Sequence, residues 1–239
     1  MNYLIRVAYD GSKFNGFQRL HEYDSVQKRL EDALSIIDKE TVLIKGAGRT
    51  DRGVHALGQC CSFKLKNNVP PERLINAINS IVDPYIKVTD CVYVDEKFHA
   101  RHSCKQKTYE YRIYTGDYNP LYYDYYLERN NIDIEQIKDV ASLFIGEHNF
   151  INFVSGTRDN YDSVIHSIDI KQEKEFIYIR FVGKSFYRYM VRNIVGAMLA
   201  YNDGRVTLND ISKLIDSDEK LKCLPTAPAN GLYLLKIEY

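Results

Sequence analysis

One carboxylate, that of Asp51, stands in a short polar turn where a reacting group could sit. Arg49 and Arg52 flank it, so we expect the acid to stay ionised near neutral pH, because nearby cations favour the charged form of a carboxyl group. Glycines and apolar runs bracket the turn: Gly46, Gly48, Gly53, Gly58, 42–44 and 60–63. Glycine lets the backbone of another molecule come close. The segment therefore indicates either a reacting carboxylate in a phosphate-rich site or a salt-bridged turn.

The composition is that of an ordinary soluble globular protein. The chain has 239 residues, of which 45% are hydrophobic and 27% charged, enough for one large domain or two modest ones. No apolar run is long enough to span a bilayer. Residues 1–6 lack the basic-then-apolar layout of a signal peptide. We therefore expect a cytoplasmic protein without a membrane partner.

The cysteines and histidines do not have the spacing of a metal site. No C-x-x-C pair occurs, and His99 and His102 have no further pair of ligands to complete a site. The odd number of cysteines indicates reduced, partly buried thiols rather than disulfides: Cys60, Cys61, Cys91, Cys104 and Cys223.

The 32 basic and 32 acidic residues cancel, so the net charge gives no sign of a nucleic-acid partner. The basic residues nevertheless gather in two stretches: Lys105, Lys107 and Arg112, then Arg180, Lys184, Arg188 and Arg192. A basic face opposite an acidic one would reconcile neutrality with an anionic partner. The 20 tyrosines and absence of tryptophan would suit base stacking in RNA sites, although we expect most tyrosines to serve packing.

Periodicity and turn residues predict an α+β protein. Strands are expected over 3–9, 85–94, 107–115, 164–171, 176–182 and 232–237. Two more are expected beside the Asp51 turn, one before it and one after it. Helices are expected from a cap at Asp24 or Ser25 to about Ile37, and over 70–81, 133–145, 186–201 and 208–216. The helix over 186–201 is expected to turn Arg192 and Asn193 away from its apolar face. The order predicts a mainly antiparallel sheet and two related α/β halves, 1–104 and 105–239.

An ordered set of motifs resembles the tRNA pseudouridine synthase A family. The matches run from Tyr3 to Tyr239, and the block Arg49–Ala56 is the most specific of them. The motifs are Tyr9-Asp10-Gly11, Gly16-Phe17-Gln18, the segment Gly46–Ala56, Phe98-His99-Ala100-Arg101, Tyr109-Glu110-Tyr111, the segment Met190–Gly196, Ala227-Pro228-Ala229 and Gly231-Leu232. The resemblance favours a catalytic role for Asp51 over the salt-bridged turn.

The resemblance implies conversion of uridine to pseudouridine in tRNA, without a metal or organic cofactor. It also implies the pseudouridine synthase fold, with the sheets of the two halves joined and a catalytic cleft between them. The N-terminal half would carry the Asp51 loop and the C-terminal half would complete the cleft. The family's usual target is the anticodon stem-loop, at positions 38, 39 and 40, and its usual assembly is a homodimer.

The resemblance also assigns roles to three further residues. Tyr109 matches the tyrosine that packs against the uracil, and Arg192 matches the basic residue that pairs with the catalytic acid. Arg49 matches an arginine that helps to flip the uridine out of its stack. Without the resemblance, Tyr109 would be a core tyrosine, Arg192 a charge on a solvated helix face and Arg49 a phosphate contact or local salt bridge.

Four residues are weaker candidates for RNA binding. His55 would contact RNA or cap the turn, and Arg101, Lys105 and Lys107 would meet the phosphate backbone or be plain surface charges. The sequence departs from the family at Phe17, where tryptophan is usual, which puts the modified tRNA positions in doubt. The alternatives are a paralogue that acts on another tRNA position or RNA, a tRNA-binding or chaperone protein on the same scaffold, and a phosphate-handling enzyme. The last is weakly indicated, because the turn around Gly48 lacks a P-loop pattern.

Overall fold

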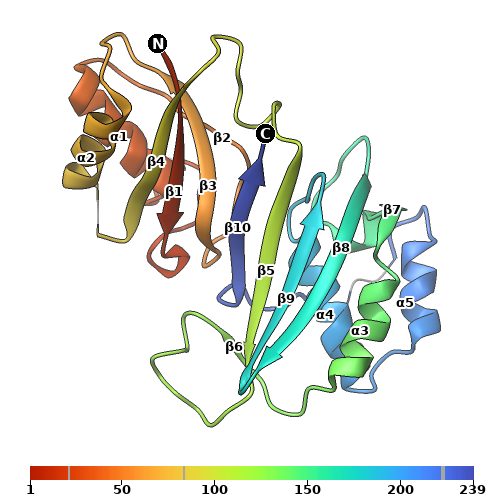
Figure 1. Ribbon diagram of the computed structural model, residues 1–239. Helices are drawn as coiled ribbons and strands as arrows, with labels where there is room; N and C mark the ends of the chain where they lie inside the picture. The colour runs from red at the N-terminus through yellow and green to blue at the C-terminus, as the bar shows by residue number, and fades with distance from the viewer. Residues whose placement is uncertain (21, 83, 222–223) are drawn as a thin grey trace. The chain divides into compact units, whose positions relative to one another are not determined.

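The computed structural model describes residues 1–20, 22–82, 84–221 and 224–239 (Figure 1). Cys223, one of the cysteines expected to be reduced, lies outside the described residues. The chain folds into two compact units. The first comprises Met1–Lys105 and Leu234–Tyr239, and the second comprises Gln106–Tyr233. The last six residues of the chain therefore belong with the first unit.

The first unit is built on an antiparallel sheet with β1 (Asn2–Tyr9) in its interior. β1 pairs with β3 (His55–Lys64) on one side and with β4 (Ile86–Val94) on the other. The short β2 (Lys45–Gly46) also pairs with β3. β10 (Leu232–Glu238), which belongs to this unit from Leu234 onward, continues the sheet beyond β3. Alternate residues of β1 are almost fully buried: Tyr3, Ile5, Val7 and Tyr9.

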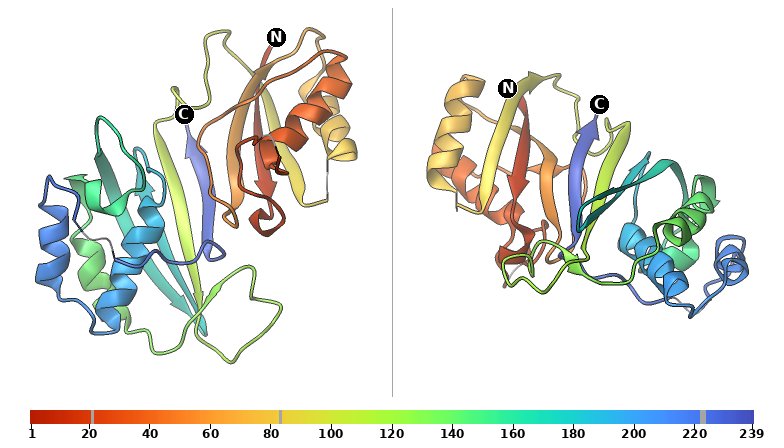
Figure 2. Two further views of the ribbon diagram at one scale, coloured as in Figure 1. Left: turned by 180° about the vertical axis from the view of Figure 1, so that it is seen from behind. Right: turned by 60° about the horizontal axis from the view of Figure 1, so that its bottom comes forward.

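Two helices cover one face of this first sheet (Figure 2). α1 (Val26–Asp38) begins at Ser25, whose hydroxyl accepts a hydrogen bond from Lys28 N at 3.3 Å, as an N-cap serine does. α2 (Pro71–Ile81) begins with a proline in its first turn, where the missing N–H costs nothing. A 3₁₀ turn, η1 (Gly11–Lys13), follows β1. Both predicted helices are confirmed, and the choice between the two caps falls on Ser25.

The second unit has its own antiparallel sheet. The strand order is β5 (Gln106–Tyr114), β9 (Phe176–Gly183), β8 (Asp162–Glu173) and β7 (Gly146–Asn149). A two-residue strand, β6 (Leu127–Glu128), adds to β5 in parallel, following a largely irregular tyrosine-rich stretch. The predicted hairpin is confirmed as β8 and β9, with Asp169 opposite Arg180 in the register.

The helices of the second unit lie on one side of its sheet (Figure 1). α3 (Ile134–Ser142) packs against α4 (Met190–Asn202), α5 (Leu208–Ile215) and β8. A 3₁₀ turn, η2 (Ile151–Phe153), contacts α4. α5 begins at Thr207 with a capping box to Asp210. None of the described helices is both long enough and apolar enough to cross a membrane.

Two sequence-based expectations about α4 were wrong. α4 begins at Met190 rather than near Phe186, because Tyr189 has a left-handed backbone with φ of 65° and so interrupts the helix. Asn193 does not face away from the apolar side: it is 7% exposed, and its Nδ2 donates to Phe153 O at 2.9 Å. The Asp51 turn joins two strands as expected: the two-residue β2 precedes it, and β3 begins at His55. The α+β class and the mainly antiparallel pairing are confirmed.

Candidate active site

The Asp51 loop, Ala47–Val54, connects β2 to β3 and is fixed at both ends. Ala47 N donates to Cys60 O at 2.8 Å, and Gln59 Nε2 donates to Gly48 O at 2.8 Å. At the tip, Val54 N donates to Asp51 O at 3.1 Å, which closes a turn around Gly53. Gly53 has φ of +82°, a conformation that glycine adopts without steric cost. The half-buried Asp51 thus lies on a short loop with a defined backbone.

Thr50 holds the Asp51 loop in place through its contacts with Tyr9 and Phe17. Its side chain is 8% exposed, and its Oγ1 lies 2.8 Å from Tyr9 Oη at the end of β1. Its carbonyl oxygen accepts a hydrogen bond from Phe17 N at 3.2 Å. Thr50, which directly precedes Asp51, is therefore tied to β1 through its side chain and to the segment after η1 through its backbone.

That segment, Phe14–Gln18, packs directly on the Asp51 loop. Gly16 has φ of +93°, and a Cβ placed on it would lie 2.9 Å from Thr50 O and 3.4 Å from the carbonyl carbon of Asp51. Phe17 is 2% exposed and fills the space beside Gly46, where a Cβ would come within 2.5 Å of its ring. The two backbones are close enough that only glycine fits at these contacts.

His55, the first residue of β3, contacts the start of η1 inside the first unit. It is 2% exposed, and its Nδ1 accepts a hydrogen bond from Gly11 N at 3.1 Å. Asp10 Oδ1 lies 3.3 Å from the same nitrogen. Because the Gly11 amide hydrogen points at Nδ1, that atom holds a lone pair and the ring proton belongs on Nε2. This hydrogen bond holds the segment after β1, and both roles expected for His55, an RNA contact or a cap of the Asp51 turn, stay predictions.

The remaining basic candidates of the first unit lie on its surface. Arg49 and Arg52 beside Asp51 are exposed, as are Arg101 and Lys105. Arg101 follows a compact turn in which its N–H donates to His99 Nδ1 at 3.1 Å. Burial, and then the neighbouring His102 at a ring separation of 4.3 Å, lower the pKa of His99. A neutral His99 is consistent with its acceptor role.

In the second unit, Tyr109 lies on β5 opposite Phe181 of β9. Its side chain is 7% exposed, and its ring meets that of Phe186 edge to face at 5.2 Å. Phe186 in turn packs over Gly183, where a Cβ would lie 2.9 Å from its ring. Lys107, two residues earlier on β5, pairs with Gly183 in the register and is half-buried. The predicted uracil-facing tyrosine is thus part of an aromatic wall.

Arg192 lies in the first turn of α4, and two contacts fix its guanidinium. Nε donates to Ala227 O at 2.8 Å, and the guanidinium carbon lies 4.8 Å from the centre of the Tyr189 ring. Ala227 N returns a hydrogen bond to Arg192 O at 3.0 Å. The Ala227-Pro228-Ala229 motif and the α4 motif, 31 or more residues apart in sequence, therefore meet at Arg192. The cation–π contact leaves the charge of Arg192 in place.

Glu110 was not identified from the sequence as part of any charge network. It is 4% exposed, and its two carboxylate oxygens accept from Arg112 Nε at 2.9 Å and from Arg180 Nη2 at 2.8 Å. The Arg112 guanidinium also stacks on the Tyr233 ring at 3.8 Å. Two members of the expected basic stretches, Arg112 and Arg180, therefore share one carboxylate within the second unit. The sequence placed Glu110 and Arg180 on two predicted strands, but the register that sets them opposite each other is known only from the structure.

The candidate residues are thus distributed over both units. Asp51, Arg49, His55, Arg101 and Lys105 lie in the first, whereas Lys107, Tyr109 and Arg192 lie in the second. Within the described parts of the chain, no group of three or more His, Cys, Asp or Glu side chains is placed to hold a metal ion.

Comparison with known proteins places the chain among RNA-modifying enzymes. The profile described as tRNA pseudouridine synthase matches residues 5–103 and 140–239. A protein of Mycoplasmoides gallisepticum named tRNA pseudouridine synthase A is 37% identical over 239 residues, covering 100% of this chain and 91% of its own. Proteins of the same name from Mycoplasma genitalium and Caldicellulosiruptor saccharolyticus are each 35% identical, with 98% and 99% of their lengths covered.

Solved structures resemble the chain only distantly. One, titled as an H/ACA RNP bound to a substrate RNA containing 2'-deoxyuridine, covers 81% of this chain and 51% of its own at 10% identity and a TM-score of 0.34. The sequence relatives are sufficient, because they match from end to end: the chain belongs to the tRNA pseudouridine synthase A family.

Proposed function

We propose that this RNA pseudouridine synthase isomerises uridine to pseudouridine in tRNA, with Asp51 as the reacting carboxylate. The observation that supports it is the Asp51 loop, which presents one carboxylate on a backbone held by β1, β3 and the Phe14–Gln18 segment. Relatives named tRNA pseudouridine synthase A match the whole chain, and the carboxylate stands in the block Arg49–Ala56, the most specific motif of the family resemblance.

The reaction breaks the bond between N1 of uracil and C1′ of the ribose and forms a bond between C5 and C1′. C5 loses its hydrogen and N1 gains one, so the product is an isomer and no oxidant or second substrate is consumed. The target base lies inside RNA, so it must leave its stack to reach the carboxylate. Asp51 would then attack the sugar, attack the base or remove a sugar proton, and its first two roles are nucleophilic.

The other residues would act on the base and on the acid. An aromatic ring at Tyr109 would keep the detached uracil in plane while it turns over. A guanidinium at Arg192 would pair with Asp51, fix its rotamer and keep it ionised. Arg49 would enter the space that the flipped uridine leaves. The fixed guanidinium of Arg192 and the aromatic wall of Tyr109 are consistent with these roles.

We further propose the anticodon stem-loop, at positions 38, 39 and 40, as the target, a homodimer as the working form and the cytoplasm as the location. These proposals rest on the family resemblance. Tyr109 and Arg192 come from one half of the chain and Asp51 from the other, so we also propose that the halves 1–104 and 105–239 together make the site.

The test is tritium release from tRNA transcripts that carry uridine labelled at C5. Wild type is compared with Asp51→Asn and with Asp32→Asn, whose carboxylate is 57% exposed on α1 and pairs with Lys28. We expect release by wild type and Asp32→Asn and none by Asp51→Asn, whose affinity for tRNA should stay within a few-fold because phosphate contacts supply most of it. Mapping the product by position reads out the target.

The same measurement separates the alternatives. Release from sites outside the anticodon stem-loop would indicate a paralogue with another target. Tight tRNA binding without any release would favour the chaperone-like alternative. Undiminished release by Asp51→Asn would remove Asp51 from the chemistry.

A further inference from the structure

Glu31 is a buried acid on α1 that touches neither Asp51 nor any other candidate site residue through a hydrogen bond that we observe. We infer that Glu31 is a positioning residue for the reaction, because its carboxylate joins the two chain segments that hold the Asp51 loop in place. The inference rests on the proposed role of Asp51.

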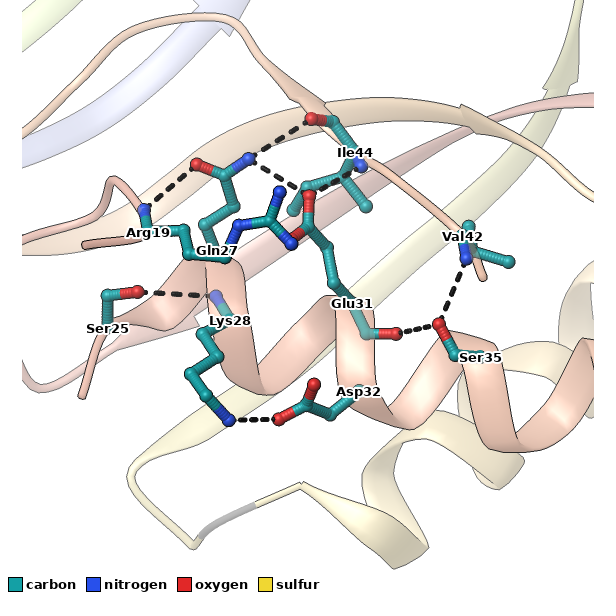
Figure 3. Close-up of polar contacts among 9 residues, drawn as sticks. All are labelled: Arg19, Ser25, Gln27, Lys28, Glu31, Asp32, Ser35, Val42 and Ile44. Carbon is teal, nitrogen blue, oxygen red and sulfur yellow. Dashed lines mark hydrogen bonds and ion pairs between the residues drawn. The ribbon is translucent and has the colours of Figure 1, made fainter. Parts of the chain in front are cut away.

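The carboxylate of Glu31 is a junction between α1 and the chain that leads into the Asp51 loop (Figure 3). Glu31 is 3% exposed, and its Oε1 accepts from Ile44 N and from Gln27 Nε2, each at 3.0 Å. Its Oε2 lies 2.9 Å from Arg19 Nη1. The side chain of Arg19 is 48% exposed, so this ion pair connects a buried anion to the surface.

Gln27, one turn earlier on α1, extends the junction to the segment that packs on the loop. Its Oε1 accepts from Arg19 N at 3.1 Å, and its own backbone N donates to Phe17 O at 2.9 Å. Its Nε2 also points to Ile44 O at 3.4 Å (Figure 3). Glu31 orients the Gln27 amide by accepting a hydrogen bond from Gln27 Nε2, so that Gln27 Oε1 faces Arg19.

The segment that contains Phe17 and the segment that contains Ile44 both lie close to Asp51. Phe17 N donates to Thr50 O, and Gly16 touches the backbone of Thr50 and Asp51. Ile44 lies directly before β2, whose Gly46 packs on the Phe17 ring. The position of Asp51 is therefore set by two segments whose spacing depends on one carboxylate.

A buried charge of this kind is a costly way to gain stability alone. Well-packed apolar side chains are often equal to or better than a buried ion pair for stability, whereas the polar pair specifies one arrangement. Catalysis needs such an arrangement, because a displacement of about 1 Å in a reacting group can cost about a hundredfold in rate. Glu31 thus has the properties of a group that fixes geometry.

The test compares single-turnover rates on saturating labelled tRNA for wild type and Glu31→Gln. The glutamine keeps an acceptor for Ile44 N but turns an N–H toward Arg19, so the junction is disturbed with little change in volume. We expect the rate to fall about ten- to a hundredfold while the tRNA dissociation constant changes less than about threefold. Amide hydrogen exchange should accelerate at Phe17, Ile44 and Val54.

Two control variants on the same helix separate positioning from stability. Ser35→Ala removes a hydroxyl that accepts from Val42 N at 2.9 Å and donates to Glu31 O at 2.7 Å, and so should lower thermal stability with an unchanged single-turnover rate. Lys28→Ala removes an exposed i,i+4 pair with Asp32 and should change neither. If Glu31→Gln does not fold, Gln27→Met replaces it as the test variant, because it removes the amide but keeps the shape of the side chain. It should slow the reaction in the same way.

The outcomes are distinct. If Glu31→Gln and Gln27→Met turn over at the wild-type rate, or if Ser35→Ala slows the reaction in proportion to its loss of stability, the positioning role is wrong. If wild type itself releases no tritium from tRNA, the proposed function fails, whatever the hydrogen exchange shows.

Discussion

Gly16 is the residue whose size bears most directly on the position of Asp51. Its backbone is left-handed and its Cα faces Thr50 O, so a side chain there meets both strain and a clash. Gly156 offers a matched comparison, because its φ of +88° is similar but no atom lies within 4 Å of an added Cβ. The two glycines therefore separate the cost of a left-handed backbone from the cost of contact with the loop.

We expect Gly156→Ala to lower the free energy of unfolding by about 1 kcal/mol, the cost of a left-handed alanine. Gly16→Ala should lose a further 1–3 kcal/mol from overpacking and at least about tenfold in single-turnover rate, because the Asp51 loop must shift. Denaturant unfolding and tritium release measure the two effects. Equal stability and activity in the two variants would show that the close packing of Gly16 is unimportant.

The described cysteines are predicted to differ in reactivity according to burial. Burial raises the pKa of Cys91 to about 12 and also raises the pKa of Cys60 and Cys61, whereas Cys104 is half-buried. Since the thiolate is the nucleophile, iodoacetamide at pH 8 should modify Cys104 before Cys60, Cys61 and Cys91 in the native protein. Peptide mapping would contradict this if Cys91 were labelled without unfolding.

At the residue scale, the sequence identified Asp51 from its surroundings but not what supports it. The ordered motifs select Asp51, Tyr109 and Arg192, and their roles remain predictions. The contacts of Thr50 with Tyr9 and of Glu31 with Ile44 join residues far apart in the chain. No periodicity encodes such pairs, because each arises from how a helix or loop packs on a strand.

The C-terminal end of α1 is tied to the turn after β3 by Asp38. Its carboxylate accepts from Lys66 N at 2.9 Å and from Asn67 N at 3.0 Å. Burial alone would raise the pKa of Asp38, but these hydrogen bonds and that from the Asn67 side chain outweigh it, so the pKa is lowered. The stability that this contact between α1 and the turn after β3 provides should therefore depend on pH.

A folded-state pKa below the unfolded value gives stability that is present above the unfolded pKa and is lost as the pH falls. We expect Asp38→Asn to lower the free energy of unfolding by about 1–3 kcal/mol at pH 7, through lost charged hydrogen bonds. The difference from wild type should shrink as the pH drops below about 4, near the unfolded pKa of aspartate. Urea unfolding at several pH values measures it, and a difference independent of pH would exclude the linkage.

The β5–β9 pair is held together by the Glu110 network. Glu110→Gln leaves two guanidiniums around a neutral side chain, and Arg180 is 53% exposed while Arg112 is 19% exposed. We expect a loss of about 2–3 kcal/mol, below the usual 3–5 for a buried pair because water reaches Arg180. Glu173→Gln, whose carboxylate is 51% exposed beside Lys171, should cost less than about 0.5 kcal/mol. Equal costs in urea unfolding would contradict the network.

At the element scale, strong periodicity was sufficient for β1, α1, α2 and the β8–β9 hairpin. It failed where conformation depends on a single residue or on a neighbour. Tyr189 adopts a left-handed backbone that its residue type does not favour, which displaces the start of α4. The four-residue β7 exists because it pairs with β8, and its own residues, Gly146–Asn149, have little strand preference.

The zero net charge of the whole chain does not reveal that its basic residues differ in whether they pair with acids. Arg112 and Arg180 are both paired with the carboxylate of Glu110. Among the residues that the structure describes, no acidic partner within ion-pair distance is found for Arg49, Arg52, Arg101 or Lys105. Exposed cations without an acidic partner in the free protein are the ones that we expect to displace counterions from a phosphate backbone. The composition alone could not distinguish the two groups, because the distinction depends on side-chain pairing.

We therefore expect tRNA affinity to fall steeply with salt despite the neutral chain, in wild type and in Asp51→Asn alike. Each neutralised phosphate contributes about −0.7 to −0.9 to the slope of log K against log salt concentration. Arg101→Gln should reduce the slope by about one such contact, whereas Arg180→Gln, which removes a guanidinium already paired with Glu110, should leave it unchanged. Filter binding from low to moderate salt measures both variants. A slope that falls for Arg180→Gln but not for Arg101→Gln would mean that ion pairing within the free protein does not decide which cations meet the RNA.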